Sequence, residues 1–200
     1  LFYDVHAARN LVTSRYCVSS GGNLNGGSGV HLNSNGLLVL EATAVRLVDN
    51  VVQSDHSMTL GESANNNGGA GLYAVAGQDF MIVFLSEVDA VNNTVWAQYS
   101  TSPSGNANGG SGVYLFCFGQ MNLTVTSMLL SNNIAYCDSV GNTRVFPNTN
   151  GGAGMFALAV VNGMMADFTE LSAVNNTVTA RNISSVSANS NGGSGVFLFC

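Results

Sequence analysis

A glycine-rich motif that occurs five times at nearly constant spacing is the feature that most constrains how this chain folds. Each copy has the form Asn-x-Asn-Gly-Gly-(Ser/Ala)-Gly, followed by Val, Leu or Met. The copies begin at Asn23, Asn65, Asn106, Asn148 and Asn189. Two slightly different spacings alternate between them, so the full period is about 83 residues. Such a period is typical of repeat proteins, in which each repeat packs on its neighbours.

A second turn signal lies between successive glycine motifs and ends in asparagine. Its five copies end at Asn10, Asn50, Asn93, Asn133 and Asn176. Each interval between glycine motifs, about 41–42 residues long, therefore contains two turn signals. If each signal marks one coil, the coil has about 21 residues and the chain has about ten coils. We expect Asn93 and Asn176 to point inward.

Residues after the second signal alternate between apolar and polar, which indicates β-strands with one buried face. The inward column contains Val12, Val52, Val95, Ala135 and Val178. The outward column beside it contains Thr13, Gln53, Trp96, Tyr136 and Thr179. In an earlier strand the inward spacing changes from two to three residues between Ala42 and Val45, which predicts a corner there.

Short strands, glycine corners and the lack of helical periodicity together predict an all-β fold. We expect a parallel β-helix, or β-solenoid, over residues 1–200, with an 83-residue super-repeat and with this segment part of a longer array. Asn and Gly tolerate the positive φ of sharp corners, which explains the motif. A phosphate-binding loop needs a following helix, and a calcium-binding nonapeptide repeat needs an Asp that this motif lacks.

The motif pair resembles the repeats of the polymorphic outer membrane proteins of chlamydiae, which also occur in surface proteins of some protists and algae. That family alternates Gly-Gly-Ala plus an apolar residue with Phe-x-x-Asn. Here the first half is Gly-Gly-(Ser/Ala)-Gly, and the second is a looser apolar-x-x-Asn such as 130–133. The resemblance spans the whole chain. It implies a right-handed parallel β-helix exposed outside the cell, where it serves in adhesion or as a surface shaft.

Charge and composition exclude several function classes. The chain has 11 acidic and 5 basic residues, a net charge of −6 and no Lys, so nucleic acid and anionic membranes are poor partners. No apolar run approaches the ~18 residues of a membrane helix. We expect no catalytic, metal-binding or cofactor-binding residues and no cofactor. Asp4, Glu87 and Glu170 share an outward column, but a full period, taken as four coils, separates each from the next.

One outward column is expected to form an aromatic stripe between two inward columns. Its members are His31, Tyr73, Tyr114, Phe156 and Phe197. Three roles stay open for this stripe: packing within the chain, contact with another subunit, or stacking on sugars.

Two covalent modifications are predicted. Asn-x-Ser/Thr sequons occur at Asn92, Asn122, Asn175 and Asn182, all expected at turns or strand ends, and they favour a secreted or cell-surface protein with N-linked glycans. Among the four cysteines, Cys117 and Cys137 are a candidate disulfide pair, with Cys137 expected to stack on Leu115; buried free thiols are the alternative.

The leading functional hypothesis is a non-enzymatic, extracellular β-helix shaft with a structural or adhesive role, such as a filament or cell-surface fibre component. Its expected partners are further coils or other copies of itself. The alternative is a carbohydrate-active protein, either a polysaccharide lyase or hydrolase or a sugar-binding module.

Overall fold

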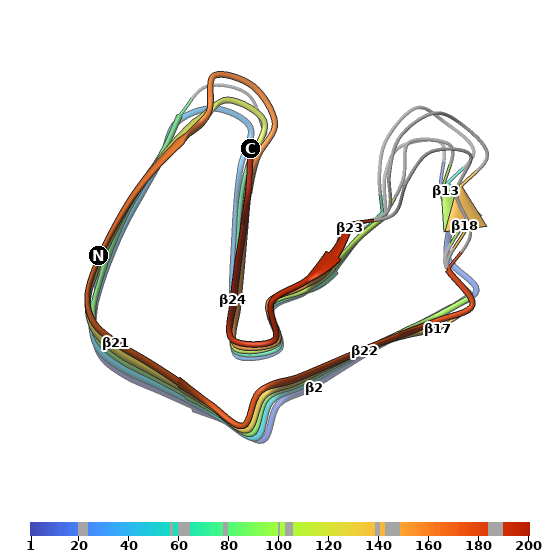
Figure 1. Ribbon diagram of the computed structural model, residues 1–200, viewed down its shortest axis with the longest axis horizontal. Helices are drawn as coiled ribbons and strands as arrows, with labels where there is room; N and C mark the ends of the chain where they lie inside the picture. The colour runs from blue at the N-terminus through green and yellow to red at the C-terminus, as the bar shows by residue number, and fades with distance from the viewer. Residues whose placement is uncertain are drawn as a thin grey trace.

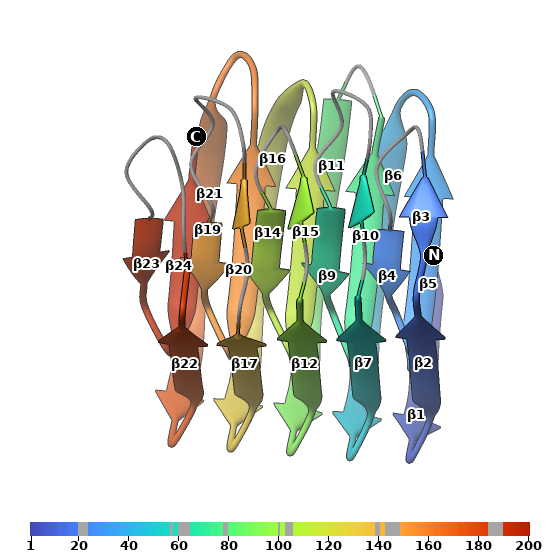
Figure 2. The same ribbon diagram turned by 90° about the vertical axis from the view of Figure 1, so that its right-hand side faces the viewer.

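The computed structural model describes residues 1–19, 24–56, 58–59, 65–77, 80–99, 101–102, 106–138, 141–142, 149–183 and 190–200. Every regular element within these ranges is a β-strand. The chain runs through five parallel sheets, here called A to E, and then returns to sheet A one layer further along (Figures 1 and 2).

Each sheet collects one strand from successive turns of the chain. Sheet A contains β1 (Phe2–Ala8), β6 (Leu38–Val48), β11 (Phe80–Val91), β16 (Gln120–Ser131) and β21 (Met164–Val174). Sheet B contains β2 (Leu11–Arg15), β7 (Val51–Asp55), β12 (Thr94–Gln98), β17 (Ile134–Asp138) and β22 (Thr177–Arg181). Sheet C contains β3 (Val18–Ser19), β8 (Met58–Thr59), β13 (Thr101–Ser102) and β18 (Gly141–Asn142). Sheet D contains β4 (Leu24–Gly26), β9 (Asn65–Gly68), β14 (Asn106–Gly109), β19 (Thr149–Gly151) and β23 (Ser190–Gly192). Sheet E contains β5 (Val30–Ser34), β10 (Leu72–Ala76), β15 (Val113–Cys117), β20 (Met155–Ala159) and β24 (Val196–Phe199).

The strands thus form five layers, numbered 1 to 5 from β1–β5 to β21–β24, which stand side by side in Figure 2. In sheet B, Val51 pairs with Leu11 on one side and Thr94 on the other. In sheet E, Leu72 pairs with Val30 and Val113. One layer therefore spans about 40–43 residues, and the expected coil of about 21 residues is wrong, because the two turn signals lie at different corners of one layer. Two layers make up the 83-residue period.

The main core lies between sheets A and E, which face each other in Figure 1. Fully buried side chains of the middle layers fill it, including Leu47, Val83, Leu115 and Leu130. Corresponding residues of layers 1 and 5 are more exposed, because each of those layers has a neighbour on one side only. The parallel, layered, all-β arrangement is consistent with a β-solenoid.

Sheet A bends at the position where the sequence predicts a corner. One residue in each layer adopts a left-handed conformation there, with φ between 52° and 58°. These residues are Asp4, Ala44, Glu87, Ser127 and Glu170. The register of sheet A skips this position, since Ser86 pairs with Thr43 and Val88 pairs with Val45 while Glu87 has no strand partner. The predicted corner between Ala42 and Val45 is confirmed.

Asparagines of the second signal form a continuous hydrogen-bonded row at the corner between sheets A and B. Asn93 shows the full pattern: its Nδ2 donates to Leu47 O at 2.8 Å and to Asn133 Oδ1 at 3.1 Å. Its Oδ1 accepts from the Nδ2 and the backbone N of Asn50, at 3.0 and 3.1 Å. Asn93 is fully buried, which confirms its expected inward orientation, and Asn50 and Asn133 are buried with it, whereas Asn176 in the last layer is half-buried. The same bonds link the row from Asn10 to Asn176. We call this row the asparagine ladder.

The glycine motif forms the corner between sheets D and E, and its first Asn lies outside the described residues in the copies at Asn23, Asn148 and Asn189. Here two constraints exclude a side chain. Gly69 and its equivalents have positive φ, which favours glycine. Gly112 lies so close to the next layer that a Cβ would come within 2.5 Å of Gly154 O and 3.0 Å of the Ala90 Cβ. The repeated glycines therefore allow the layers to pack at β-sheet spacing, about 4.8 Å.

Candidate functional site

The predicted aromatic stripe forms a continuous row of neighbouring rings, but its three middle members lie inside the molecule. Tyr73, Tyr114 and Phe156 are fully buried, so their expected outward position is wrong. Neighbouring rings along His31, Tyr73, Tyr114, Phe156 and Phe197 have centroids 4.9 to 5.4 Å apart. The cause is that the middle strands of sheet E are buried on both faces. Their unbroken apolar runs, such as 72–76, are the sequence signal for this arrangement.

The stripe packs against the glycine corner. A Cβ on Gly68 would collide with the ring of Tyr114, and a Cβ on Gly110 would lie 2.9 Å from the Cβ of Phe156. The hydroxyls of Tyr73 and Tyr114 are buried without a hydrogen-bond partner in the described structure. Burial raises the pKa of both hydroxyls well above the usual range of tyrosine, with a further contribution from Tyr73 to the pKa of Tyr114. The stripe is therefore a core element.

Exposed aromatic residues occur on several sheets, Phe84 of sheet A among them, and one group of them lies together on the outer face of sheet B. The indole of Trp96 packs against the ring of Tyr136 with centroids 4.5 Å apart and ring planes tilted by 37°, and Trp96 is still 40% exposed. The hydroxyl of Tyr136 donates to Asp138 Oδ2 at 3.2 Å, and the Arg181 guanidinium lies 6.0 Å from the centroid of its ring. Tyr136 is therefore in contact with Asp138 and near Arg181, and its ring packs against the indole of Trp96.

A second aromatic row stands at the end of the same strands. The ring of His56 lies between those of Tyr16 and Tyr99, with centroids 4.8 and 4.6 Å away. Its Nδ1 lies 2.7 Å from Asp55 Oδ1. Tyr16 and Tyr99 are 72% and 51% exposed. All three aromatic residues have positive φ, which turns their side chains outward at this corner.

We call the outer side of sheet B, with this corner row, the aromatic face. Two rows of rings border polar side chains on it, among them Thr13, Gln53 and Gln98. Among the described residues, neither glutamine has a side-chain hydrogen-bond partner. The charged side chains of the face are two Arg and two Asp: Arg15, Arg181, Asp55 and Asp138. The face is therefore amphipathic and has no net charge. The sequence places Trp96 and Tyr136 outward, but the ring pairs appear only once the register between layers is known.

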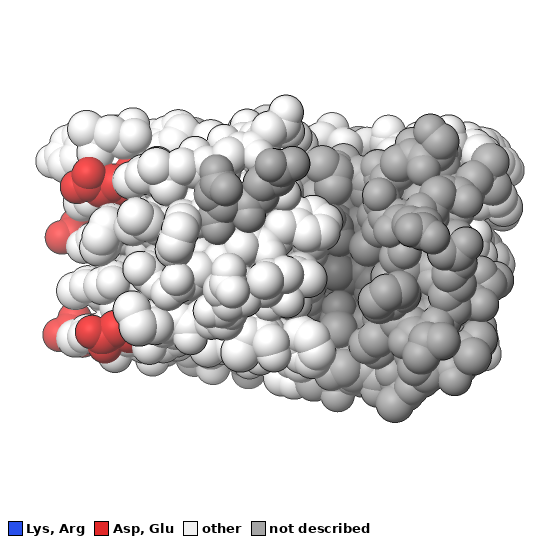
Figure 3. Space-filling model, turned by 90° about the horizontal axis from the view of Figure 1, so that it is seen from above, with Lys and Arg blue, Asp and Glu red and all other residues white. Residues whose placement is uncertain are grey.

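Acidic side chains concentrate on sheet A, at the left end of the view in Figure 3. Those on its strands are Asp4, Glu41, Glu87, Asp89, Asp167 and Glu170. Asp4 and Glu87 are two layers apart rather than four, which is about 10 Å between backbones. Together with His6, Arg46 and Asp89 they line a shallow polar depression, in which Arg46 Nε lies 3.9 Å from Asp89 Oδ2. No group of three or more His, Cys, Asp or Glu in the described ranges is arranged to hold a metal ion.

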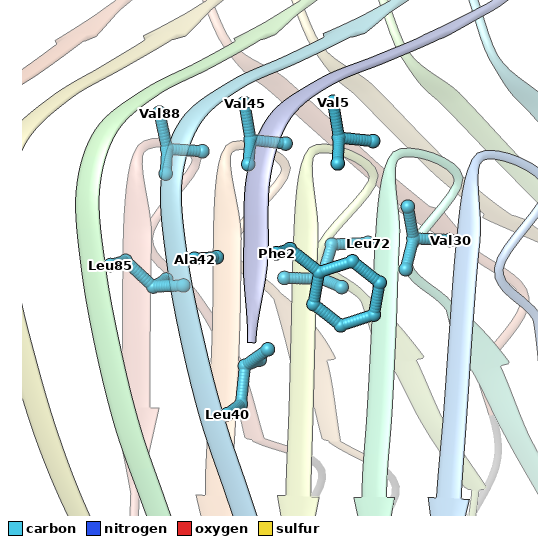
Figure 4. A pocket seen from close by; sticks show the side chains of 9 residues that line it. All are labelled: Phe2, Val5, Val30, Leu40, Ala42, Val45, Leu72, Leu85 and Val88. Carbon is cyan, nitrogen blue, oxygen red and sulfur yellow. The ribbon is translucent and has the colours of Figure 1, made fainter.

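The small cavity in Figure 4 lies in the core between sheets A and E. Apolar side chains of layers 1 to 3 line it entirely, among them Phe2, Leu40, Leu72 and Leu85. With no polar group on its wall, it offers no hydrogen bond to a ligand. It is a gap in core packing.

The four sequon asparagines differ in accessibility. Asn92, Asn175 and Asn182 are exposed and have positive φ, whereas Asn122 is half-buried in sheet A. Asn92 Nδ2 donates to Asp49 Oδ1 at 3.1 Å, and Asn182 Nδ2 donates to Asp138 Oδ1 at 2.9 Å. The hydroxyl residue of the last sequon, Ser184, lies outside the described residues.

All four cysteines are free thiols. Cys117 lies in sheet E and pairs with Ala76 and Ala159, whereas Cys137 lies in sheet B and pairs with Ala97 and Ala180. The expected stacking of Cys137 on Leu115 is therefore wrong, and the two thiols of the candidate disulfide are on different sheets. Burial raises the pKa of the Cys137 thiol to about 12, and it also raises the pKa of Cys117.

Comparisons with protein-family models, curated proteins and solved structures found no match for this chain. Within the part of the chain that the structure describes, no helix is long and apolar enough to cross a membrane.

Proposed function

We propose that this chain is part of an extracellular, non-enzymatic β-solenoid shaft with a structural or adhesive role. The observation that carries the proposal is the asparagine ladder, which links all five layers from Asn10 to Asn176. A hydrogen-bonded row whose three middle members are fully buried favours a single rigid stacking geometry. A stiff stack that exposes polar and aromatic side chains suits a shaft better than it suits a catalytic cleft.

The finer features of the fold belong to the same proposal. We propose that the layers form a right-handed coil, because parallel crossover connections are right-handed in about 98% of cases. The resemblance to the chlamydial surface repeats supports a place outside the cell. Glycans at the exposed Asn92 and Asn175 would supply solubility to a chain in which 8% of the residues are charged.

Two measurements test the shaft. Negative-stain electron microscopy and sedimentation of the purified protein should show rod-shaped particles, with further copies or further layers of the repeat continuing the rod. Compact round particles at every concentration would contradict a shaft.

The enzymatic alternative is tested separately. Incubation with acidic and neutral polysaccharides should release neither new reducing ends nor unsaturated products. The acidic depression on sheet A gives the sharpest variant for this test. If the protein cleaves a polysaccharide and Glu87→Gln abolishes that cleavage, the chain is a lyase or hydrolase and the proposed non-enzymatic role is wrong. Among the alternatives, the aromatic face favours a sugar-binding module.

A further inference from the structure

We infer that the aromatic face binds an uncharged polysaccharide, with a sugar ring lying against the indole of Trp96. This inference rests on the proposed adhesive role and names the class of ligand that the adhesive surface recognises.

The first argument is the position of the indole. Trp96 lies in layer 3, and Tyr136 of layer 4 covers one side of its indole. On the other side, the residue in the same column of layer 2 is Gln53, which has no ring. The indole is thus the last ring of this aromatic pair, it lies beside a shorter, polar side chain, and Trp96 remains 40% exposed. A sugar ring carries apolar C–H groups on its faces and hydroxyls around its rim. A flat aromatic surface packs against those C–H groups in the way that aromatic rings pack on apolar groups elsewhere.

The second argument is the supply of hydrogen bonds next to the ring. Gln53 lies beside Trp96 in the layer below, and Gln98 lies two residues along the same strand. An amide side chain both donates and accepts, and so does a sugar hydroxyl. Neither amide has a side-chain partner among the described residues, so neither must break an internal bond to meet a ligand. Binding sites for small polar molecules commonly combine aromatic walls with a few such groups.

The third argument is charge. The two Arg and two Asp side chains of the aromatic face cancel, whereas the whole chain has a net charge of −6. An anionic polysaccharide or a nucleic acid would meet repulsion from the protein and no basic cluster on this face. An uncharged chain of sugars meets no such repulsion. The charge pattern of the face therefore distinguishes between the two kinds of polysaccharide.

The fourth argument is that the aromatic face is rigid before it binds. Val95 and Ala97, the inward neighbours of Trp96, are fully buried, and the asparagine ladder fixes the strand at its start. The hydroxyl of Tyr136 is tied to Asp138. A surface that is already ordered loses little conformational entropy on binding, which favours affinity from few contacts.

Trp96 is the only tryptophan in the chain, so its fluorescence reports directly on this surface. We would titrate the protein with cellohexaose, chitohexaose, laminarihexaose and mannohexaose, and with hexagalacturonate as the anionic control. At least one neutral hexasaccharide should shift the emission to shorter wavelength and saturate, while hexagalacturonate should not. Calorimetry on Trp96→Ala should give an association constant about tenfold lower. Gln53→Ala should also weaken binding, and Trp96→Phe should retain most of it.

The matched control is Phe84→Ala, which removes an aromatic side chain of similar exposure, 48%, from the outer side of sheet A. Its affinity should equal that of the unaltered protein, and circular dichroism should show every variant folded. The inference is overturned if no neutral hexasaccharide binds, if hexagalacturonate binds equally well, or if folded Trp96→Ala binds normally. If the protein forms rods but binds none of these sugars, only this inference fails and the proposed shaft stands. If the protein releases cleaved sugar, the proposed non-enzymatic role fails instead.

Discussion

The side-chain amide of Asn50 donates to the side-chain oxygen of Asn93, 3.0 Å away in the next layer, and both residues are fully buried. The oxygen of Asn93 also accepts from the backbone N of Asn50 at 3.1 Å. The side-chain oxygen of Asn93 therefore accepts from two donors of the preceding layer. Its Nδ2 donates to one acceptor in the preceding layer and one in the next. A single substitution here affects three layers.

We expect Asn93→Ala to lower the free energy of unfolding by about 3 kcal/mol or more, because it leaves several buried polar groups without partners, each costing about 1–3 kcal/mol. Urea unfolding followed by circular dichroism measures this loss. Asn10→Ala is the control at the same corner, where the residue is exposed and has a neighbouring layer on one side only. Equal losses in the two variants would show that ladder continuity contributes nothing.

Gly112→Ala tests the close approach of the layers. Its φ is not in the left-handed region, so the substitution acts through the contacts of the new Cβ with Gly154 O and Ala90. We expect a loss of about 2 kcal/mol or more, as for other overpacked cores. Gly163→Ala is the opposite case: its φ of 81° is in the left-handed region, but nothing lies within 4 Å of the new Cβ. Thermal unfolding should therefore show the larger loss at Gly112.

Tyr114→Phe should raise stability by about 1 kcal/mol, because it removes a buried hydroxyl that has no partner in the described structure. The ring stack with Tyr73 and Phe156 is retained. Tyr114→Ala, in contrast, should cost about 3–5 kcal/mol through the cavity that it leaves. Thermal unfolding of the two variants measures both changes. A loss of stability in Tyr114→Phe would show that the hydroxyl has a partner.

Stability should fall as the pH rises above about 9. The Cys137 thiol has a pKa of about 12 in the fold against 9.0 as its usual value. Because the folded pKa is the higher one, the unfolded chain loses its thiol proton at a lower pH than the folded protein does. The free energy of unfolding is therefore unaffected below the unfolded pKa and falls as the pH rises from there toward the folded pKa. Tyr73 and Tyr114 act in the same direction above their unfolded pKa of 10.0. Urea midpoints between pH 8 and 11 test this, and Tyr73→Phe/Tyr114→Phe should make the decline shallower.

Thiol labelling distinguishes the cysteines. Cys117 and Cys137 are buried, whereas Cys200 is exposed, so a thiol reagent at pH 8 should modify Cys200 and leave the two buried thiols intact. Denaturation should make all four reactive. Mass spectrometry of labelled peptides identifies each site. Modification of Cys137 as fast as of Cys200 in the folded protein would contradict its burial.

Glycan mapping tests the secreted assignment. Expression through a eukaryotic secretory pathway should place glycans on Asn92 and Asn175, whose side chains are exposed, and fewer on the half-buried Asn122. Glycopeptide mass spectrometry gives the occupancy of each sequon. Bare Asn92 and Asn175 in the secreted protein would contradict the prediction.

The sequence predicted most of the local structure and less of its assembly. Alternation around Val95 and the spacing change after Ala42 indicated the right strands and the right corner, because these signals depend on a few neighbouring residues. The layer length was wrong because the Gly-rich and Asn-ending signals both look like coil boundaries, and only the pairing of Leu72 with Val113 distinguishes corners from layers.

The same limit applies to the aromatic residues. Tyr73 and Trp96 both alternate with smaller or apolar neighbours, so local pattern places both outward. What separates them is the second covering of sheet E by the glycine corner, against which the row of rings packs, and local alternation does not show that this corner lies over the strand. The stacking partner of Trp96 is Tyr136, which lies a whole layer further along the chain, and no local rule selects that residue.

The asparagine ladder also gives the stack a direction. From Asn10 to Asn133, each side-chain amide donates to the side-chain oxygen of the asparagine in the next layer, so every one of these accepting oxygens faces the layer before it. The amide dipoles are therefore aligned and polarise one another along the axis. A layer entering the row upside down would set oxygen against oxygen. Any further stretch of the repeat must therefore join with the same polarity, so a longer fibre built this way would have two chemically distinct ends.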